Sequence, residues 1–134
     1  MASEVERAVA VITDRLGAAR VDAIWLFGSR ARGAAHPASD LDLAVLARPS
    51  LSLLERGALM DLAGRSLGMD VDVIDLETAE SILAWEVMTT GKLVFDSDSG
   101  RPEQFLLDAR HRAEDAERRN RMVSLAWTQD ASRP

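Results

Sequence analysis

The sequence that decides the fold is Val21-Asp-Ala-Ile-Trp-Leu-Phe-Gly-Ser29, followed ten residues later by Asp40-Leu-Asp-Leu-Ala-Val45. The first segment is a short apolar run, typical of a buried strand, that ends directly in a Gly-Ser pair. The second opens with two aspartates at positions i and i+2. A third apolar run, Val71-Asp-Val-Ile-Asp-Leu76, carries another aspartate at its second position. Together these segments predict three strands of one sheet, with polar residues at the ends of two of them.

The aspartates indicate a metal site. Side chains at positions i and i+2 of a strand point to the same face, so Asp40 and Asp42 can converge. Clustered carboxylates repel one another, which raises a pKa or recruits a cation. Their oxygens suit Mg²⁺, which binds a few carboxylates and completes its shell with water and substrate phosphates. If the strand carrying Asp72 lies beside the first, Asp72 is a third ligand and a candidate base for an acceptor hydroxyl.

The Gly-Ser pair indicates a phosphate site. Gly28 has no Cβ, so the backbone can turn sharply and approach a phosphate closely. Ser29 offers a hydroxyl and a backbone N–H, and a short helix starting there would point further N–H groups at the phosphates. Arg30 and Arg32 add positive charge, and arginine suits forked contacts to phosphate oxygens. We therefore expect these four residues to bind the triphosphate of a nucleotide such as ATP.

Other site classes fit the sequence less well. The segment Gly28-Ser-Arg-Ala-Arg-Gly33 has the spacing of the first half of a P-loop, but Ala34-Ala35 stands where Lys-Ser/Thr is required. The chain has no cysteine, which excludes disulfides, thiolate zinc sites and a cysteine nucleophile. Each feature on its own is common in loops and at strand ends. Their order and spacing together favour nucleotidyl transfer.

The pattern Gly28-Ser29-x10-Asp40-x-Asp42, with Asp72 downstream, resembles the signature of the polymerase-β-like nucleotidyltransferase superfamily. Residues 4–96 look most like its minimal nucleotidyltransferases, and closest to the MntA-like antitoxins encoded beside HEPN-domain toxins. The resemblance implies that Gly28 and Ser29 bind the triphosphate and that the three aspartates bind Mg²⁺. It also implies AMP transfer from ATP to a tyrosine of a partner HEPN ribonuclease toxin, which would disable the toxin.

Two alternatives stay open at this point. The chain could be a nucleotidyltransferase for small molecules, of the antibiotic-modifying kind, although little sequence remains to build a second substrate pocket. It could instead be a binding protein that neutralises a toxin by occlusion without catalysis. The intact set of carboxylates argues against that alternative, because clustered acids are costly to keep without a ligand.

Composition limits the function further. The 134 residues suit one domain, residues 1–134, and the 47% apolar content suits a packed core. The net charge is −6, so the basic footprint of a nucleic-acid-binding protein is missing and direct binding of nucleic acid is disfavoured. No apolar run is long enough to span a membrane, and no signal peptide is recognisable. We expect a cytoplasmic enzyme.

The pattern predicts an α/β (α+β) fold of the polymerase-β-like nucleotidyltransferase type. We expect strands near residues 21–27, 40–47, 70–75 and 93–95 in a small mixed sheet. Helices are expected from Ser3 to Gly17, from Ser52 to Leu67, and from a Thr78 cap to Gly91. All are expected on one face, which leaves the other for the triphosphate. A C-terminal helix, about 102–126, either packs on the domain or extends its far end, with Met122, Val123 and Trp127, to a partner.

Overall fold

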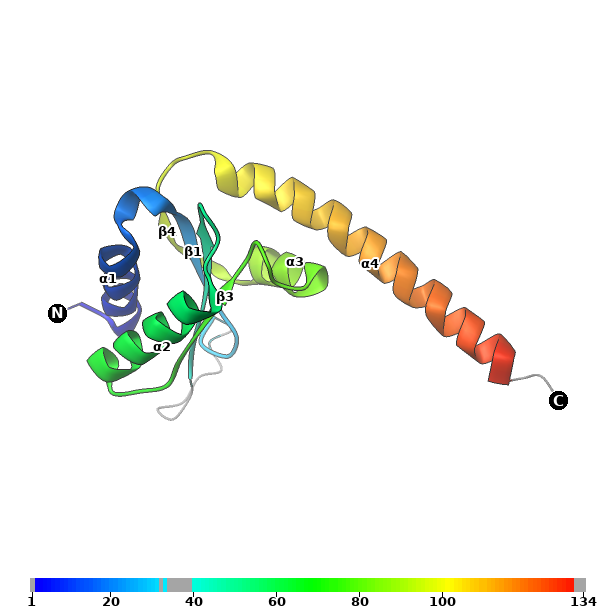
Figure 1. Cartoon of the computed structure of the whole chain (residues 1–134), viewed down its shortest axis with the longest axis horizontal. Helices are drawn as coiled ribbons and strands as arrows, with labels where there is room; N and C mark the ends of the chain where they lie inside the picture. Colours follow the sequence, from blue (N-terminus) through cyan, green and yellow to red (C-terminus); the bar gives the residue numbers. More distant parts are fainter. Residues whose placement is uncertain (1, 32, 34–39, 132–134) are drawn as a thin grey trace.

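The computed structural model describes residues 2–31, 33 and 40–131. Its centre is a four-stranded sheet in the order β3-β2-β1-β4. The strands are β1 (Val21–Phe27), β2 (Leu41–Ala47), β3 (Val71–Asp75) and β4 (Lys92–Asp96). The helices are α1 (Glu4–Leu16), α2 (Leu53–Leu67), α3 (Ser81–Thr90) and α4 (Arg101–Ala131), and a 3-10 turn η1 (Ala18–Arg20) leads into β1. Figure 1 shows the sheet between its helices, with α4 extending well beyond it.

The strands run in both directions, as predicted. β1 pairs antiparallel with β2 and with β4, whereas β2 pairs parallel with β3 across the crossover through α2. A parallel neighbour needs such a crossover, and α2 supplies it. The mixed sheet, the four helices and the α/β class are therefore confirmed.

Two helices cover the first face of the sheet. Ile12 of α1 and Leu59 of α2 are fully buried against strand residues such as Ile24 and Leu43. Both helices begin at the predicted caps. The Ser3 Oγ accepts from the backbone N–H of Glu6 at 3.1 Å, and Ser52 forms a reciprocal capping box with Glu55. Gly68 ends α2 in the left-handed conformation, with φ +67°.

The expectation of a single helical face holds for α1 and α2 but needs a correction. A second apolar cluster lies on the opposite face, where α3 and the start of α4 cover Trp25, Ala44 and Leu46. The reason is visible in the strands: the first six residues of β1 are all buried, which is the pattern of a strand covered on both sides. At one end of this face, among the described residues, Asp42 is half-buried and Asp72 is exposed, so this end is accessible to solvent.

A second correction concerns the start of α3. The predicted cap, Thr78, lies in the turn before the helix, and α3 begins at Ser81. The Thr78 hydroxyl donates to Oδ2 of the buried Asp75 at 2.8 Å. The Leu76 N–H donates to the Val45 carbonyl and prolongs the contact of this segment with β2. The helix therefore begins two residues later than predicted, with Glu80 rather than Thr78 at its cap position, a shift that local sequence does not reveal.

Arg101, the first residue of α4, is held in place by ion pairs with Asp22 and Glu77. The Arg101 guanidinium donates to Asp22 Oδ2 at 2.7 Å, to the Ala47 carbonyl at 3.3 Å and to Glu77. Burial alone would raise the pKa of Asp22. Hydrogen bonds from Arg101 and Ser99, together with the charges of Arg101 and Arg48, hold this pKa below its ordinary value instead. The anchor fixes the start of α4 on the sheet.

The two halves of α4 have different surroundings. Pro102, Phe105, Ala109 and Ala113 are buried against the domain. Beyond them the helix projects away from the sheet (Figure 1), and its large apolar side chains are exposed: Met122, Val123, Leu125 and Trp127, the last by 74%. The packed interpretation is thus confirmed for the first half, and a partner contact at the far end stays a prediction. Within the described residues, no helix has the length and apolar character to cross a bilayer.

The projecting half should contribute little to stability. We predict that a chain ending at Arg119 melts within about 2 °C of the full chain, because the side chains removed between Asn120 and Trp127 are exposed. In the same assay Phe105→Ala should lose about 3–5 kcal/mol, because it removes a buried aromatic ring. Thermal melts followed by circular dichroism measure both. A large loss on truncation would show that the far end packs against something in solution.

Candidate active site

The Gly-Ser and Asp-x-Asp motifs meet at the ends of two paired strands. Phe27 of β1 is opposite Asp42 of β2, so Gly28 leaves the sheet beside the Asp42 side chain. A Cβ built on Gly28 would lie 2.3 Å from Asp42 Oδ2, far inside van der Waals contact. Gly28 also has φ +75°, in a region that other residues rarely adopt. Glycine is therefore required here for two independent reasons.

The third aspartate lies on the neighbouring strand, as predicted. Asp42 of β2 and Asp72 of β3 are register partners in the parallel pair, so their side chains start from the same face. Asp42 is half-buried, while Asp40 and Asp72 are exposed. Burial raises the pKa of Asp42 above its ordinary value, and the charges of Asp72 and Asp40 raise it further. The structure therefore brings the three acids into one electrostatic neighbourhood.

This neighbourhood fits a divalent cation by its chemistry. Across residues 2–31, 33 and 40–131, no three His, Cys, Asp or Glu side chains form a ready-made metal cage. Magnesium does not need one, because it is usually held by one or two carboxylates together with water and substrate phosphates. A cation would also relieve the repulsion that raises the pKa of Asp42. Oxygen donors, like-charge crowding and access to solvent are the properties expected of such a site.

The loop after β1 departs from expectation. Residues 29–31 form a turn, and the Gly33 N–H donates to the Arg30 carbonyl at 3.3 Å, so no helix begins at Ser29. The guanidinium of Arg30 donates to Glu4 Oε2 at 2.8 Å and ties the loop to α1. That contact gives Arg30 a structural task that the sequence did not suggest. Phosphate binding by Ser29 and Arg30 stays a prediction, and Arg32 lies outside the described residues.

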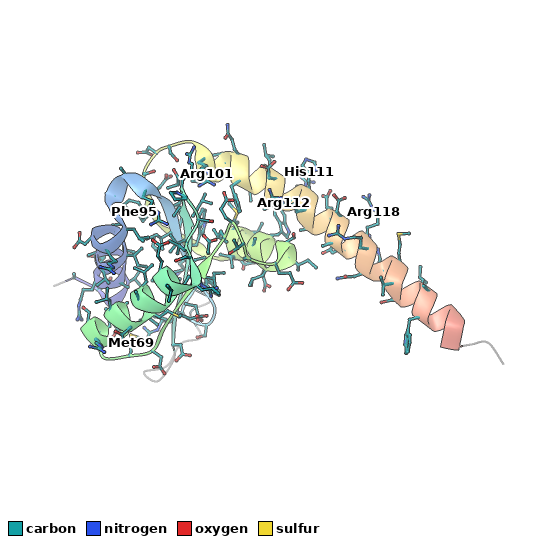
Figure 2. The ribbon with its side chains drawn as sticks, viewed as in Figure 1. Met69, Phe95, Arg101, His111, Arg112 and Arg118 are labelled. Carbon is teal, nitrogen blue, oxygen red and sulfur yellow. The ribbon has the colours of Figure 1, made fainter. Side chains whose placement is uncertain are left out.

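Beside the three aspartates is a hollow of about 770 Å³ that sequence reasoning did not find. It lies between the C-terminal half of α2 and the start of β3, and Met69 marks its position in Figure 2. Its lining residues are Asp40, Asp42, Met60, Asp61, Gly64, Arg65, Gly68, Met69, Asp70, Val71 and Asp72. One signal was available in the sequence: Asp70 and Asp72 repeat the i, i+2 spacing of the first pair.

Comparison with known proteins places this geometry in a family. Residues 12–100 match the polymerase beta nucleotidyltransferase family. The chain belongs to this family. Over 73 residues it is 40% identical to the protein adenylyltransferase MntA of Shewanella oneidensis, a match that covers 54% of this chain and 52% of that protein. Over 56 residues it is 41% identical to a probable protein adenylyltransferase MntA of Haemophilus influenzae, covering 41% and 49% of the two chains. The chain thus spans about half the length of the curated relatives it matches.

Solved structures agree over a longer stretch. A chain from a toxin–antitoxin crystal structure with AMP-PNP superposes with a TM-score of 0.77 and 28% identity, over 93% of this chain and 99% of that one. A chain from the complex of tri-AMPylated Shewanella oneidensis HEPN toxin with its MNT antitoxin gives a TM-score of 0.70 and 25% identity, over 92% and 99%. Coverage of this extent supports the polymerase-β-like fold over nearly the whole chain.

The contact between Gly28 and Asp42 yields a matched pair of variants. Gly28→Ala and Gly100→Ala both place alanine at a positive φ, +75° and +78°, but Gly100 has open space around its Cβ position. Each should cost about 1–2 kcal/mol in stability from backbone strain. Only Gly28→Ala should displace the Asp42 carboxylate and abolish binding of Mg²⁺·ATP, measured by calorimetry. Normal nucleotide binding by Gly28→Ala would show that Asp42 does not need its observed position.

The raised pKa of Asp42 predicts that replacing this residue with asparagine stabilises the protein by an amount that depends on pH. Because the folded state raises this pKa, ionised Asp42 destabilises the protein, and the penalty is absent below the ordinary carboxyl pKa. Asp42→Asn should therefore raise the melting temperature of the metal-free protein slightly near pH 7. The difference from the wild type should shrink as the pH falls toward 4. Melting curves across pH 4–8 in EDTA test this, and a gain that does not change with pH would contradict it.

Proposed function

We propose that this chain transfers AMP from ATP to a hydroxyl of a partner HEPN-domain toxin and thereby acts as its antitoxin. The observation that carries the proposal is the close approach of Gly28 to the Asp42 carboxylate, with Asp72 as the register partner of Asp42. A turn suited to phosphate and a set of carboxylates suited to a metal ion would both contact a triphosphate bound between them, because the metal ion coordinates the phosphates. The relatives named adenylyltransferase, and the AMPylated toxin in the complex with an antitoxin, point to the same reaction.

Asp40, Asp42 and Asp72 are the residues that would hold Mg²⁺. When bound, the ion would neutralise charge on the triphosphate and on the departing pyrophosphate. Gly28 lets the backbone come close to the phosphates, and Ser29 would donate its hydroxyl and N–H groups to them. These contacts fix the α-phosphorus near the acids, so that the geometry of attack is set before the acceptor arrives.

The reaction is an in-line displacement at the α-phosphorus. The acceptor oxygen forms a bond to this phosphorus, and the bond from phosphorus to the oxygen bridging to the β-phosphate breaks. Pyrophosphate leaves with that bridging oxygen. Asp72, which is exposed on β3, would take the hydroxyl proton and pass it to solvent, as a general base within reach of the acceptor. The products are AMP-modified acceptor, pyrophosphate and a proton.

The rivals gain no support from the structure or the relatives. Transfer to a small molecule finds no counterpart among the named relatives, which are protein adenylyltransferases. Neutralisation by binding alone leaves the crowding of acids around Asp42 unexplained, because that crowding opposes ionisation of Asp42. A protein acceptor also suits a chain of net charge −6 better than a nucleic acid does.

We predict that Asp40→Asn/Asp42→Asn abolishes AMP transfer to a co-expressed HEPN toxin while the chain stays folded. Asparagine keeps the size of the side chain but removes the charge that holds a cation. Intact mass spectrometry should show the toxin without AMP-sized additions, and cell growth should again be inhibited. Asp14→Asn/Asp108→Asn removes the same charge from exposed sites on α1 and α4 and should modify the toxin normally.

Removing divalent metal with a chelator tests the metal assignment independently of the variants. ATP affinity, measured by calorimetry, should rise strongly with Mg²⁺ or Mn²⁺, and equal affinity in EDTA would exclude the metal assignment. Full protection of cells by the Asp40→Asn/Asp42→Asn chain would show instead that neutralisation works by binding alone.

A further inference from the structure

We propose that the hollow between α2 and β3 is the acceptor subsite, and that it receives a hydroxyl side chain carried on an uncharged or basic stretch of polypeptide. The inference rests on the proposed function, because it assigns the second substrate of the same site. Three features of the structure support it: the position of the hollow relative to Gly28, the charge of its lining, and its apolar wall.

The position follows from the strand order. Gly28 follows β1, Asp42 lies on β2 and Asp72 on β3, which form consecutive strands of the sheet. All three aspartates line the hollow, but neither Gly28 nor Ser29 does. A triphosphate held at the Gly-Ser turn would therefore leave the hollow free, on the far side of the carboxylates. In-line displacement requires the acceptor to approach from the side opposite the leaving group, and a hollow that shares the aspartates but not the Gly-Ser turn offers such an approach.

The charge of the lining selects the acceptor. Among the described residues of the lining, the acids are Asp40, Asp42, Asp61, Asp70 and Asp72, whereas the one base, Arg65, already pairs with Asp61, Nε to Oδ1, at 3.1 Å. A single Mg²⁺ does not neutralise a triphosphate, so a bound Mg²⁺·ATP leaves the outer acids uncompensated. A surface concavity of one sign repels ligands of that sign and concentrates those of the opposite sign. Polyanions such as RNA are disfavoured, and neutral or basic protein segments are favoured.

The apolar wall suits a side chain with a flat or extended body. Met60 and Met69 are half-buried, pack against the main core, and line the hollow. Methionine side chains adapt their shape and contact aromatic rings well. Gly64 adds no side chain of its own, and its carbonyl accepts from Gly68 and Met69, which fixes the loop that carries Met69. The volume is in the range of pockets that bury a small molecule or one side chain with its neighbours.

The test reverses the outer charges and leaves the three catalytic aspartates intact. Asp61→Lys/Asp70→Lys changes the charge of the rim by four units. Asp14→Lys/Asp108→Lys makes the same change on α1 and α4, outside the lining of the hollow, and serves as the matched control. The acceptor is a purified HEPN-domain toxin, the partner named in the proposed function. Initial rates of AMP transfer give kcat and KM for the acceptor, and calorimetry gives the affinity for Mg²⁺·ATP.

We expect the rim variant to raise KM for the acceptor about tenfold or more, with kcat within about threefold and Mg²⁺·ATP affinity retained. The effect should weaken at high salt, and the control should stay within about twofold of the wild type. Met69→Gln should also raise KM, and Met69→Leu should restore it, because leucine keeps the apolar wall. Melting curves confirm that each variant is folded.

Each other outcome overturns the inference. An unchanged KM in both the rim variant and Met69→Gln, with active wild type, excludes the hollow as the acceptor subsite and leaves the proposed function standing. A fall in kcat at constant KM excludes it as well. Efficient AMP transfer by the wild type to an RNA oligonucleotide would overturn the choice of a protein acceptor. No transfer to the toxin by the wild type would overturn the proposed function, and the subsite with it.

Discussion

The contact between the Gly28 backbone and the Asp42 carboxylate is the constraint on which the site depends. A hydrogen at Cα is all that fits, because a methyl group would overlap Oδ2. This closeness makes one site out of two motifs that are separated in sequence, and the β1–β2 register supplies it by placing Phe27 opposite Asp42. The antiparallel pairing sets how near the Gly28-Ser29 turn lies to the acids, and the parallel pairing of β2 with β3 sets where Asp72 lies. Site geometry is thus a consequence of sheet topology.

Local sequence was sufficient where local physics decides. Apolar runs bounded by polar residues located the four strands to within two residues of their ends. The Ser52–Glu55 capping box and the left-handed Gly68 located both ends of α2, because these motifs satisfy backbone groups within one turn of the helix. The proximity of Asp42 and Asp72 was also predictable, since a single helix between two apolar runs favours a parallel crossover.

The features that could not be predicted from the sequence depend mostly on contacts between residues that are far apart in the chain. The pairing of Arg30 with Glu4 joins the turn after β1 to α1 across 26 residues of sequence. Thr78 looked like a helix cap, but the buried carboxylate of Asp75 accepts its hydroxyl instead. The hollow depends on how α2 lies against the start of β3, so the local sequence around Met60 and Met69 does not predict it. The second helical face depends on α3 and α4 returning to the sheet.

The pKa values of acidic side chains shift in opposite directions at the two ends of the sheet. At the end that carries α4, Arg101 and Arg48 lie against Asp22 and hold its pKa low, and Arg20 with the Ser52 N–H lowers the pKa of Glu55 to about 2. Figure 2 shows Arg101 at this end and Met69 at the other. Around Met69, Asp42 has acids as neighbours and its pKa is raised. Arginine-paired acids stabilise the fold above their pKa values, whereas the acids around Asp42 oppose it. Asp22 and Glu55 are thus paired with arginine, whereas the neighbours that shift the pKa of Asp42 are the acids Asp72 and Asp40. This difference in neighbours is the physical reason for assigning a structural role to Asp22 and Glu55 and for proposing a functional one for Asp42.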